Sequence, residues 1–265
     1  MSQGEALRMP MVFFGHGTPM NALEDSPLTR VWGALGRELP RPKAILCVSA
    51  HWQTRGTAVT STDAPKTIHD FGAFPQALFD VHYPAPGEPK LAGRVGELLA
   101  PRQVFADQGQ WGLDHGTWSV LVHAYPDASV PVVQLSMDVG ISPAERFAIG
   151  QRLAPLREEG VMIVGTGNVV HNLPRMNWSA ADARAYPWAQ RFHDYIGSAV
   201  RNDQPQAVVD FESQGEDARL SAPTPDHFWP LLYVLGARAA GEPVRFENDF
   251  IQHASLGMTS MVFGA

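Results

Sequence analysis

Short apolar runs alternate with longer stretches of helical period along the chain. The runs Met11–Phe14 and Ala44–Ser49 flank a segment that begins at Ser26 and Pro27. In that segment the apolar positions recur every three or four residues, at Leu28, Val31, Trp32, Leu35 and Leu39. This spacing indicates an amphipathic helix, and serine followed by proline is a typical helix start. We therefore predict a strand, a helix and a second strand.

The same order returns in the middle of the chain. The strand-like run Val130–Ser136 precedes Ser142-Pro143-Ala144-Glu145, which has the serine, proline and glutamate of a capped helix N-terminus. This helix is predicted to run to about Glu159, with Gly160 as its C-cap and Val161–Val164 as the next strand. Further helices are expected at about 88–100, 117–124, 186–201 and 225–238, and a last strand at about 258–263.

Alternation of strands and helices favours an α/β fold, with a largely parallel central sheet, helices on both faces and a site at the carboxyl ends of the strands. No repeat, low-complexity stretch or change of composition marks a linker, so we expect residues 1–265 to form a single domain. The segment 62–87 is rich in glycine and proline and is predicted to be an active-site loop or lid.

Composition narrows the classes of function. The 265 residues include 27 acidic and 20 basic ones, for a formal net charge of −7, and Lys and Arg form no cluster. Binding to nucleic acid or to a membrane surface is therefore not expected. We expect a small-molecule partner instead.

The N-terminal residues lack the basic and apolar regions of a secretory signal, and no apolar run reaches the roughly 18 residues of a membrane span, so we expect a cytoplasmic protein. The single Cys47 is predicted to be a buried thiol. The sequence does not indicate an oligomeric state.

Histidines follow the predicted strands. His16 comes after the first strand, His51 after the second, and His171 after the strand Val161–Val164. Because the carboxyl ends of parallel strands lie at one edge of a sheet, these imidazoles are expected to lie close together. His227 falls in the first turn of the helix predicted after Thr224, and His115 in a loop bracketed by glycines.

Imidazole is the commonest protein ligand for metals and suits Fe(II), Zn(II) and Cu(II). Converging histidines without cysteines are typical of a catalytic metal. A lone histidine more often makes an ordinary hydrogen bond, so the prediction depends on position and not on number. His123 and His193 are expected to be satisfied residues of helix faces, His69 and His82 to be loop residues, and no partner is assigned to His253.

Other catalytic motifs are missing from the sequence. It contains no Gly-x-Ser-x-Gly elbow, no His-Glu-x-x-His and no phosphate-binding Gly-x-x-x-x-Gly-Lys. Gly165-Thr166-Gly167 follows a strand, but Val170 stands where a dinucleotide-binding loop needs its third glycine.

Six short motifs together resemble one known family. They are Gly15-His16-Gly17-Thr18-Pro19-Met20, Ser49-Ala50-His51-Trp52, Thr67-Ile68-His69-Asp70-Phe71-Gly72, Asp114-His115-Gly116, Gly167-Asn168-Val169-Val170-His171-Asn172 and Thr224-Pro225-Asp226-His227. This set resembles the class III extradiol ring-cleavage dioxygenases, in particular the 4,5-DOPA-extradiol-dioxygenase-like branch, from about residue 9 to the C-terminus.

The resemblance implies a reaction and roles for the histidines. His16, His51 and His227 would hold one divalent metal. His171 would act as acid and base and is counted among the candidate metal ligands, and His115 would contact dioxygen and substrate. The protocatechuate-cleaving relatives use a glutamate as third ligand, where this chain offers His227. The implied reaction opens a catechol, DOPA-like or another aromatic diol, with O2 to give a semialdehyde.

The identity of the metal leaves alternatives open. Fe(II) is expected for ring cleavage, whereas an all-histidine site also suits Zn(II). One alternative is a zinc hydrolase that activates water at the same histidines, and another is a non-enzymatic binding module on this fold. Four aromatic residues are candidates for either a pocket or the core: Trp52, Phe71, Phe74 and Trp118.

Overall fold

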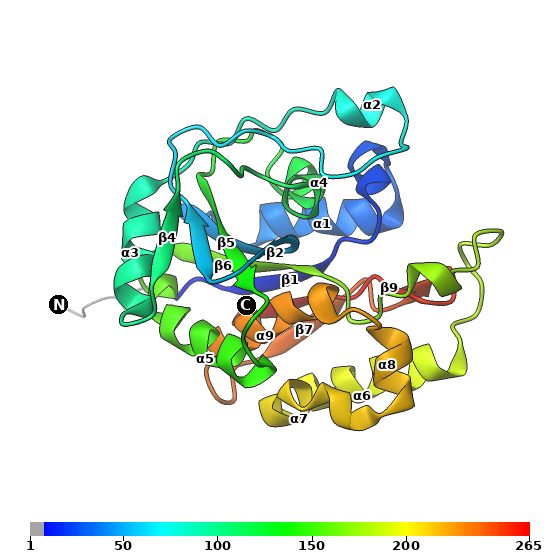
Figure 1. Ribbon diagram of the computed structural model, residues 1–265. Helices are drawn as coiled ribbons and strands as arrows, with labels where there is room; N and C mark the ends of the chain where they lie inside the picture. Colours follow the sequence, from blue (N-terminus) through cyan, green and yellow to red (C-terminus); the bar gives the residue numbers. More distant parts are fainter. Residues whose placement is uncertain (1–7) are drawn as a thin grey trace.

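A central sheet of eight strands runs through the computed structural model, which describes residues 8–265 (Figure 1). Its strands are β1 (Met11–Gly15), β2 (Ala44–Thr54), β3 (Thr57–Thr60), β4 (Val104–Asp107), β5 (Val132–Asp138), β6 (Val161–Gly167), β7 (Val244–Glu247) and β10 (Ser260–Phe263). They lie in the order β4-β3-β5-β2-β6-β1-β10-β7. The four central strands β5, β2, β6 and β1 are mutually parallel. At one edge β10 pairs antiparallel with β1, and β7 pairs antiparallel with β10.

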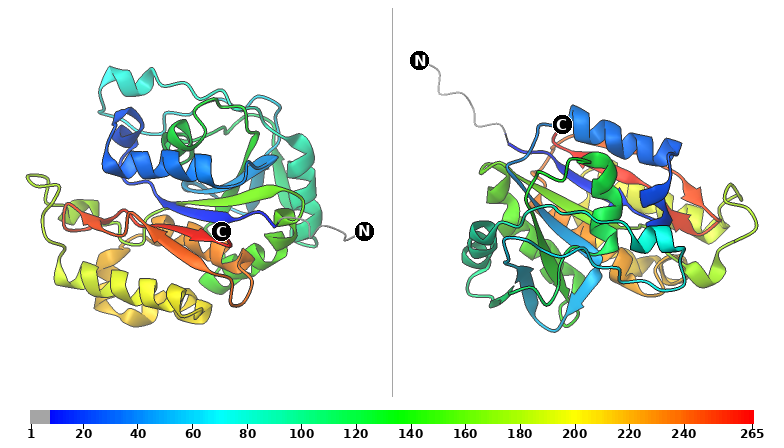
Figure 2. Two further views of the ribbon diagram at one scale, coloured as in Figure 1. Left: turned by 180° about the vertical axis from the view of Figure 1, so that it is seen from behind. Right: turned by 90° about the horizontal axis from the view of Figure 1, so that it is seen from above.

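Helices cover both faces of the sheet (Figures 1 and 2). α1 (Pro27–Glu38) and α4 (His115–Ala124) pack on one face. The opposite face is covered by α3 (Pro89–Leu99), α5 (Pro143–Leu153), α6 (Pro187–Arg201) and α9 (Trp229–Ala237). Three short helices complete the set: α2 (Gln76–Phe79), α7 (Pro205–Val209) and α8 (Glu216–Ser221). The α/β class and the largely parallel sheet are as predicted.

The central strands have two buried faces, which explains their continuous apolar runs. Val12 and Phe14 of β1 belong to the core beneath α1 and α4, whereas Met11 and Phe13 belong to the core beneath α5 and α9. Successive side chains of a strand point to opposite faces, so a strand covered on both sides needs apolar residues at every position. Cys47 of β2 is buried as predicted, and burial raises the pKa of its thiol to about 12.

Several element boundaries differ from the predictions. β2 continues to Thr54 instead of ending near Ser49. α5 stops at Leu153, and a 3-10 turn, Ala154–Arg157, replaces the end of the predicted helix because Pro155 cannot donate a backbone hydrogen bond. The helix expected over 225–238 is divided into a 3-10 turn, Pro225–His227, and α9.

The sequence pattern did not predict the short strands at or near the edges of the sheet, nor a small separate hairpin. β3, β4 and β7 have four residues each, and the small hairpin of β8 (Ile251–Gln252) and β9 (Leu256–Gly257) has two residues on each side. Runs this short and partly exposed contain too few positions to show a period. The segment 62–87 is irregular apart from a bridge at Thr67 and helix α2, in agreement with a long loop.

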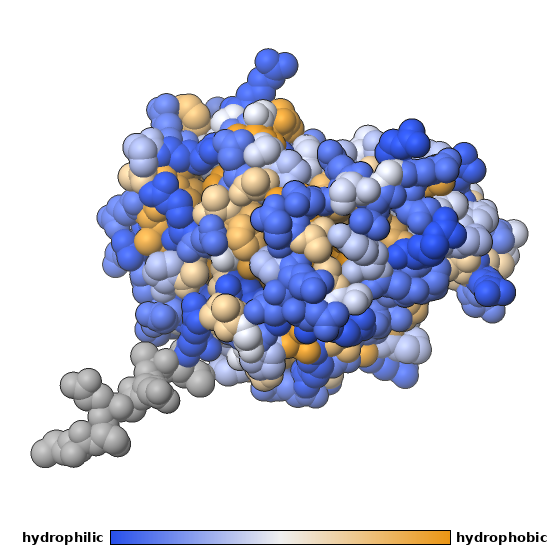
Figure 3. Space-filling view, turned by 90° about the horizontal axis from the view of Figure 1, so that it is seen from below, coloured by the Kyte–Doolittle hydropathy of each residue, from blue (hydrophilic) through white to orange (hydrophobic). Residues whose placement is uncertain are grey.

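The described residues include no helix that could cross a membrane. Within 8–265 no helix combines the length and the apolar character that a bilayer crossing requires. On the face shown in Figure 3, apolar residues are scattered among hydrophilic ones.

A buried arginine ties the start of β1 to the end of α9. Arg157 is fully buried; its Nε donates to the Met9 carbonyl at 2.8 Å and its Nη1 to the Ala237 carbonyl at 3.1 Å. The guanidinium also forms a two-point ion pair with Glu242. Burial alone would raise the pKa of Glu242, but the hydrogen bonds from Arg157 and the Ala239 amide lower it overall.

We predict that Arg157→Met destabilises the fold by about 3–5 kcal/mol, because the buried carbonyls of Met9 and Ala237 lose their donor and the partly buried Glu242 carboxylate loses its partner. The pKa of Glu242 is lower in the folded than in the unfolded state, so the ion pair contributes stability above about pH 4.3 and loses it as the pH falls through the folded pKa. The variant should lack this acid-dependent part of the unfolding free energy in urea titrations. Arg245→Met, at a half-exposed arginine paired with Glu38 and Glu247, is the control and should cost less than about 1 kcal/mol. Equal losses in both variants would contradict the assignment.

Candidate active site

Strand register brings the carboxyl ends of the central strands to one level. Gly15 of β1 pairs with Gly167 of β6, and Ser49 of β2 pairs with Thr166 of β6. His16 directly follows β1, and His51 lies two residues beyond Ser49, so both side chains emerge at the same edge of the sheet. His51 lies within β2 and not after it, because β2 continues past an irregularity between Val48 and Gln53.

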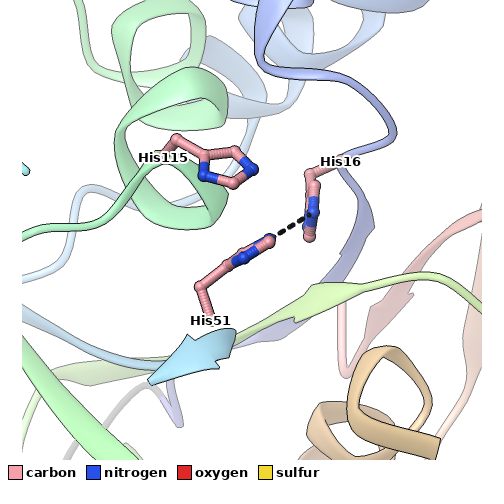
Figure 4. Close-up of side chains that lie close together, drawn as sticks. All are labelled: His16, His51 and His115. Carbon is pink, nitrogen blue, oxygen red and sulfur yellow. Dashed lines mark hydrogen bonds between the residues drawn. The ribbon is translucent and has the colours of Figure 1, made fainter. Parts of the chain in front are cut away.

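Three imidazoles from separate elements point toward one another at this edge (Figure 4). The Nε2 atoms of His16 and His51 lie 3.1 Å apart. His115 joins them from α4, and one potential ligand atom of each of the three residues lies within 4.8 Å of the others. His115 is the first residue of α4 instead of a loop residue, because the Asp114 side chain caps this helix by accepting from the Thr117 amide.

Two further predicted histidines complete the cluster. The ring centroid of His227, in the 3-10 turn Pro225–His227, lies 5.3 Å from that of His16 and 5.0 Å from that of His51. The Thr224 side chain does not cap this turn, contrary to the predicted helix start. His171 stacks on His227 with 3.5 Å between centroids and 5° between planes. The five histidines therefore meet, although they are spread over more than 200 residues of sequence.

Two carboxylates hold three of these rings in place. Asp70 Oδ2 lies 2.9 Å from His115 Nδ1 and 3.4 Å from His51 Nδ1, while Asp70 Oδ1 accepts from the His115 amide at 2.8 Å. Asp226 Oδ2 lies 2.6 Å from His227 Nδ1. Burial would raise the pKa of Asp70 and of Asp226, but hydrogen bonds from His115 and His227 lower both values overall. A carboxylate on one ring nitrogen leaves the other nitrogen free to bind a ligand or metal.

Sequence reasoning gave these two aspartates no role. Both aspartates belong to the six motifs that resemble the dioxygenase family. Asp226 directly precedes His227, and Asp70 lies in the predicted loop 62–87. The role of Asp226 could have been predicted, because this residue directly precedes His227. The contact of Asp70 with His115 spans 45 positions, and no sequence pattern indicates it.

Burial keeps three of the clustered rings, His16, His51 and His171, uncharged. It lowers the pKa of His16 and His51 well below the ordinary value, and neighbouring histidines lower both further. Burial, then the proximity of His227, lowers the pKa of His171 to about 3. His16 Nδ1 is buried and has no hydrogen-bond partner within residues 8–265. Metals bind the neutral form of imidazole, so this donor set fits a divalent cation.

Two glycines make room for the cluster. A Cβ on Gly116 would lie 2.6 Å from Ser49 Oγ and 2.8 Å from His51 Cδ2. A Cβ on Gly167 would lie 2.1 Å from the His227 carbonyl oxygen, which accepts a 2.8 Å hydrogen bond from the Asn168 amide. Any side chain at either position would therefore displace a histidine.

A cavity of about 460 Å³ adjoins the cluster and contacts His51, His115, His171 and His227. Its walls are mainly apolar and include Met20, Phe71, Phe74, Leu173, Met176, Trp178 and Leu256. Phe71 and Phe74 come from the segment 62–87. Trp118 is instead fully buried, and Trp52 stacks on Trp111 at 5.8 Å.

The other histidines lie outside the cluster. His69 contacts the Val81 carbonyl, His123 the Asn21 carbonyl and His193 the Thr259 hydroxyl, at 3.0, 2.8 and 2.8 Å. His253 contacts the Asn177 carbonyl at 3.0 Å and lines the cavity.

The fold and the histidine site define a class of protein. Residues 12–264 match the family described as the catalytic LigB subunit of aromatic ring-opening dioxygenase. The chain belongs to this family and is an enzyme of the extradiol ring-cleavage dioxygenase class.

Individual relatives cover almost the whole chain. It is 52% identical to an Escherichia coli K12 protein named 4,5-DOPA dioxygenase extradiol, over 97% of this chain and 95% of that one. A Beta vulgaris protein of the same name is 39% identical over 89% of this chain and 88% of its own length. A crystal structure titled as an uncharacterized Escherichia coli K12 protein superposes with a TM-score of 0.85 at 46% identity, covering 97% of this chain and all of that one.

We predict that Gly167→Ala lowers both stability and metal affinity, because the methyl group would push the His227 backbone away from the cluster. Overpacking of this kind costs about 1–3 kcal/mol. Thermal unfolding and metal content of the purified variant measure the two effects. Gly93→Ala is the control: Gly93 lies inside α3 with open space around its Cα, so alanine there should be neutral or stabilising. A Gly167→Ala protein that matches this control in both measurements would refute the steric argument.

Proposed function

We propose that this chain cleaves a catechol, DOPA-like or another aromatic diol, by extradiol addition of O2, giving a ring-opened semialdehyde that carries both oxygen atoms. The observation that carries the proposal is the meeting of five histidines beside an aromatic-walled cavity. Membership of the ring-opening dioxygenase family and similarity to proteins named 4,5-DOPA dioxygenase extradiol support it. Residues 1–265 act as one catalytic domain.

The metal ligands in this proposal are His16, His51 and His227, with His171 beside them. The resemblance of Thr224-Pro225-Asp226-His227 to the family motif supports His227 as the third ligand. In the structure its ring centroid lies 5.3 Å from that of His16 and 5.0 Å from that of His51, and the ring of His115 lies at 5.8 and 3.8 Å. Each of the two rings has a carboxylate on its Nδ1, from Asp226 or Asp70. A bound redox-active ion such as Fe(II) would supply a site at which a diol and dioxygen can exchange electrons. Zn(II) fits the same donors but is not redox-active, so it would not supply this chemistry.

The remaining groups bind the substrate and move its protons. Phe71 and Phe74 stack against or flank the catechol ring, and segment 62–87, which carries them, acts as the lid that keeps bulk water out. His171 lines the cavity and takes a proton from the diol. Asp70 accepts from His115 Nδ1 and would stabilise the doubly protonated ring, whose Nε2–H donates to negative charge that develops on oxygen.

The two possible metal triads predict different metal contents. We expect His227→Ala to lose most of its bound metal and His115→Ala to retain it, when untagged proteins are loaded with Fe(II) without oxygen and analysed by emission spectrometry. The geometry makes this a real choice, because ligand atoms of His16, His51 and His115 lie within 4.8 Å of one another. Metal loss in His115→Ala with full occupancy in His227→Ala would assign the third position to His115.

We predict that iron-loaded protein consumes oxygen and forms a yellow product with a catechol, and that His171→Ala lowers this turnover by about 10²–10⁴-fold with the metal still bound. An oxygen electrode and absorbance measure both. Lys90→Ala, at an exposed residue of α3 outside both the cavity and segment 62–87, is the control and should be fully active. If iron-loaded protein consumed no oxygen with any of a panel of catechols, the proposed function would be wrong.

A further inference from the structure

We propose that Glu24 makes the cavity selective for catechols with a cationic amine side chain over catechols with an anionic carboxylate. This inference rests on the proposed function, because it assumes that the diol binds at the histidines. The ring substituent of such a catechol then extends toward the cavity mouth, and the side chains at the mouth select it.

Glu24 and Trp178 mark that mouth. Both line the cavity and both are exposed, Trp178 to 70%. They reach the mouth from different parts of the chain: Glu24 follows the 3-10 turn Pro19–Leu23, and Trp178 lies in the irregular segment between β6 and α6. A substituent that leaves the cavity between them contacts a carboxylate and an aromatic ring.

Backbone hydrogen bonds fix Glu24 relative to the histidines. Its amide donates to the Asn21 carbonyl at 3.2 Å, and its carbonyl accepts from the Thr29 hydroxyl at 2.8 Å. Asn21 in turn donates through Nδ2 to the His16 carbonyl at 2.9 Å. Asn21 therefore links the Glu24 backbone to that of His16, a proposed metal ligand. The Glu24 side chain takes no part in these hydrogen bonds and can contact a substrate.

In the described part of the chain the Glu24 carboxylate is not paired with a basic side chain, although Glu24 also lines a neighbouring cavity together with Arg30 and Arg37. Within residues 8–265 its carboxylate forms no ion pair, whereas the neighbouring Asp25 forms a two-point pair with Arg30 at 2.6 and 2.9 Å. The residues that line the cavity include no lysine or arginine. Arg175 lies close in sequence to Leu173 and Met176, but it is exposed and is not among the lining residues.

These charges distinguish two substituents that have the same two-carbon arm and opposite terminal charges. An ammonium group at the mouth gains attraction from Glu24 and from the face of the Trp178 ring, since cations bind aromatic faces. A carboxylate at the same point meets repulsion from Glu24 and no cation among the lining residues. Gln252 is a neutral partner open to either group.

Dopamine and dihydrocaffeate test the inference, because they share a catechol ring and a two-carbon arm and differ in the terminal charge. We expect zinc-loaded protein, titrated without oxygen in a calorimeter at low salt, to bind dopamine about fivefold more tightly than dihydrocaffeate. Glu24→Gln should bring the two affinities within about twofold, mainly by weakening dopamine. Added salt should reduce the wild-type preference, because the charges at the mouth are exposed.

Asp25→Asn is the matched control, since it removes one negative charge at the adjacent residue but outside this cavity. It should leave the dopamine preference unchanged. Tighter binding of dihydrocaffeate by the wild type, an unchanged preference in Glu24→Gln, an equal loss in Asp25→Asn, or no binding of either ligand would each overturn the inference. Oxygen uptake by iron-loaded protein with the same two catechols tests the proposed function separately, because zinc-loaded protein reports binding without turnover.

Discussion

Two uncharged imidazoles face each other across 3.1 Å at the buried edge of the sheet, and the rest of the site is built around that contact. Two protonated rings could not remain at this distance, because both burial and mutual repulsion oppose their charge. A metal cation at the centre of such a cluster would accept the lone pairs of several neutral imidazole nitrogens at once. The cluster could therefore hold one metal ion.

The fold provides the rigidity that this arrangement needs. Four parallel strands in register bring His16 and His51 to one level, and Asp114 locks α4 to the sheet by bonding Ser49 of β2 and Gln134 of β5, both at 2.7 Å. Burial, then the nearby Asp70, raises the pKa of Asp114, so its position depends on these hydrogen bonds. Sites held by strand ends and capped helices are more exact than sites on free loops.

The sequence predicted the features that depend on local period and on strand direction. Continuous apolar runs identified the central strands, and the rule that parallel strands end at one edge placed His16, His51 and His171 together before any distance was known. The pattern also singled out His115 and His227, and the resemblance to a family gave them their expected roles. Local pattern could not predict the short strands at or near the edges of the sheet, the end of α5 at Pro155, or the pairing of Asp70 with His115, because each depends on contacts between distant parts of the chain or on runs too short to show a period.

X-ray absorption at the iron edge tests the central claim most directly. Untagged protein reconstituted with Fe(II) under anaerobic conditions should bind one ion per chain, with a spectrum dominated by imidazole nitrogen and by the outer-ring scattering that histidine produces. Substoichiometric iron, or an iron environment without imidazole scattering, would contradict the account.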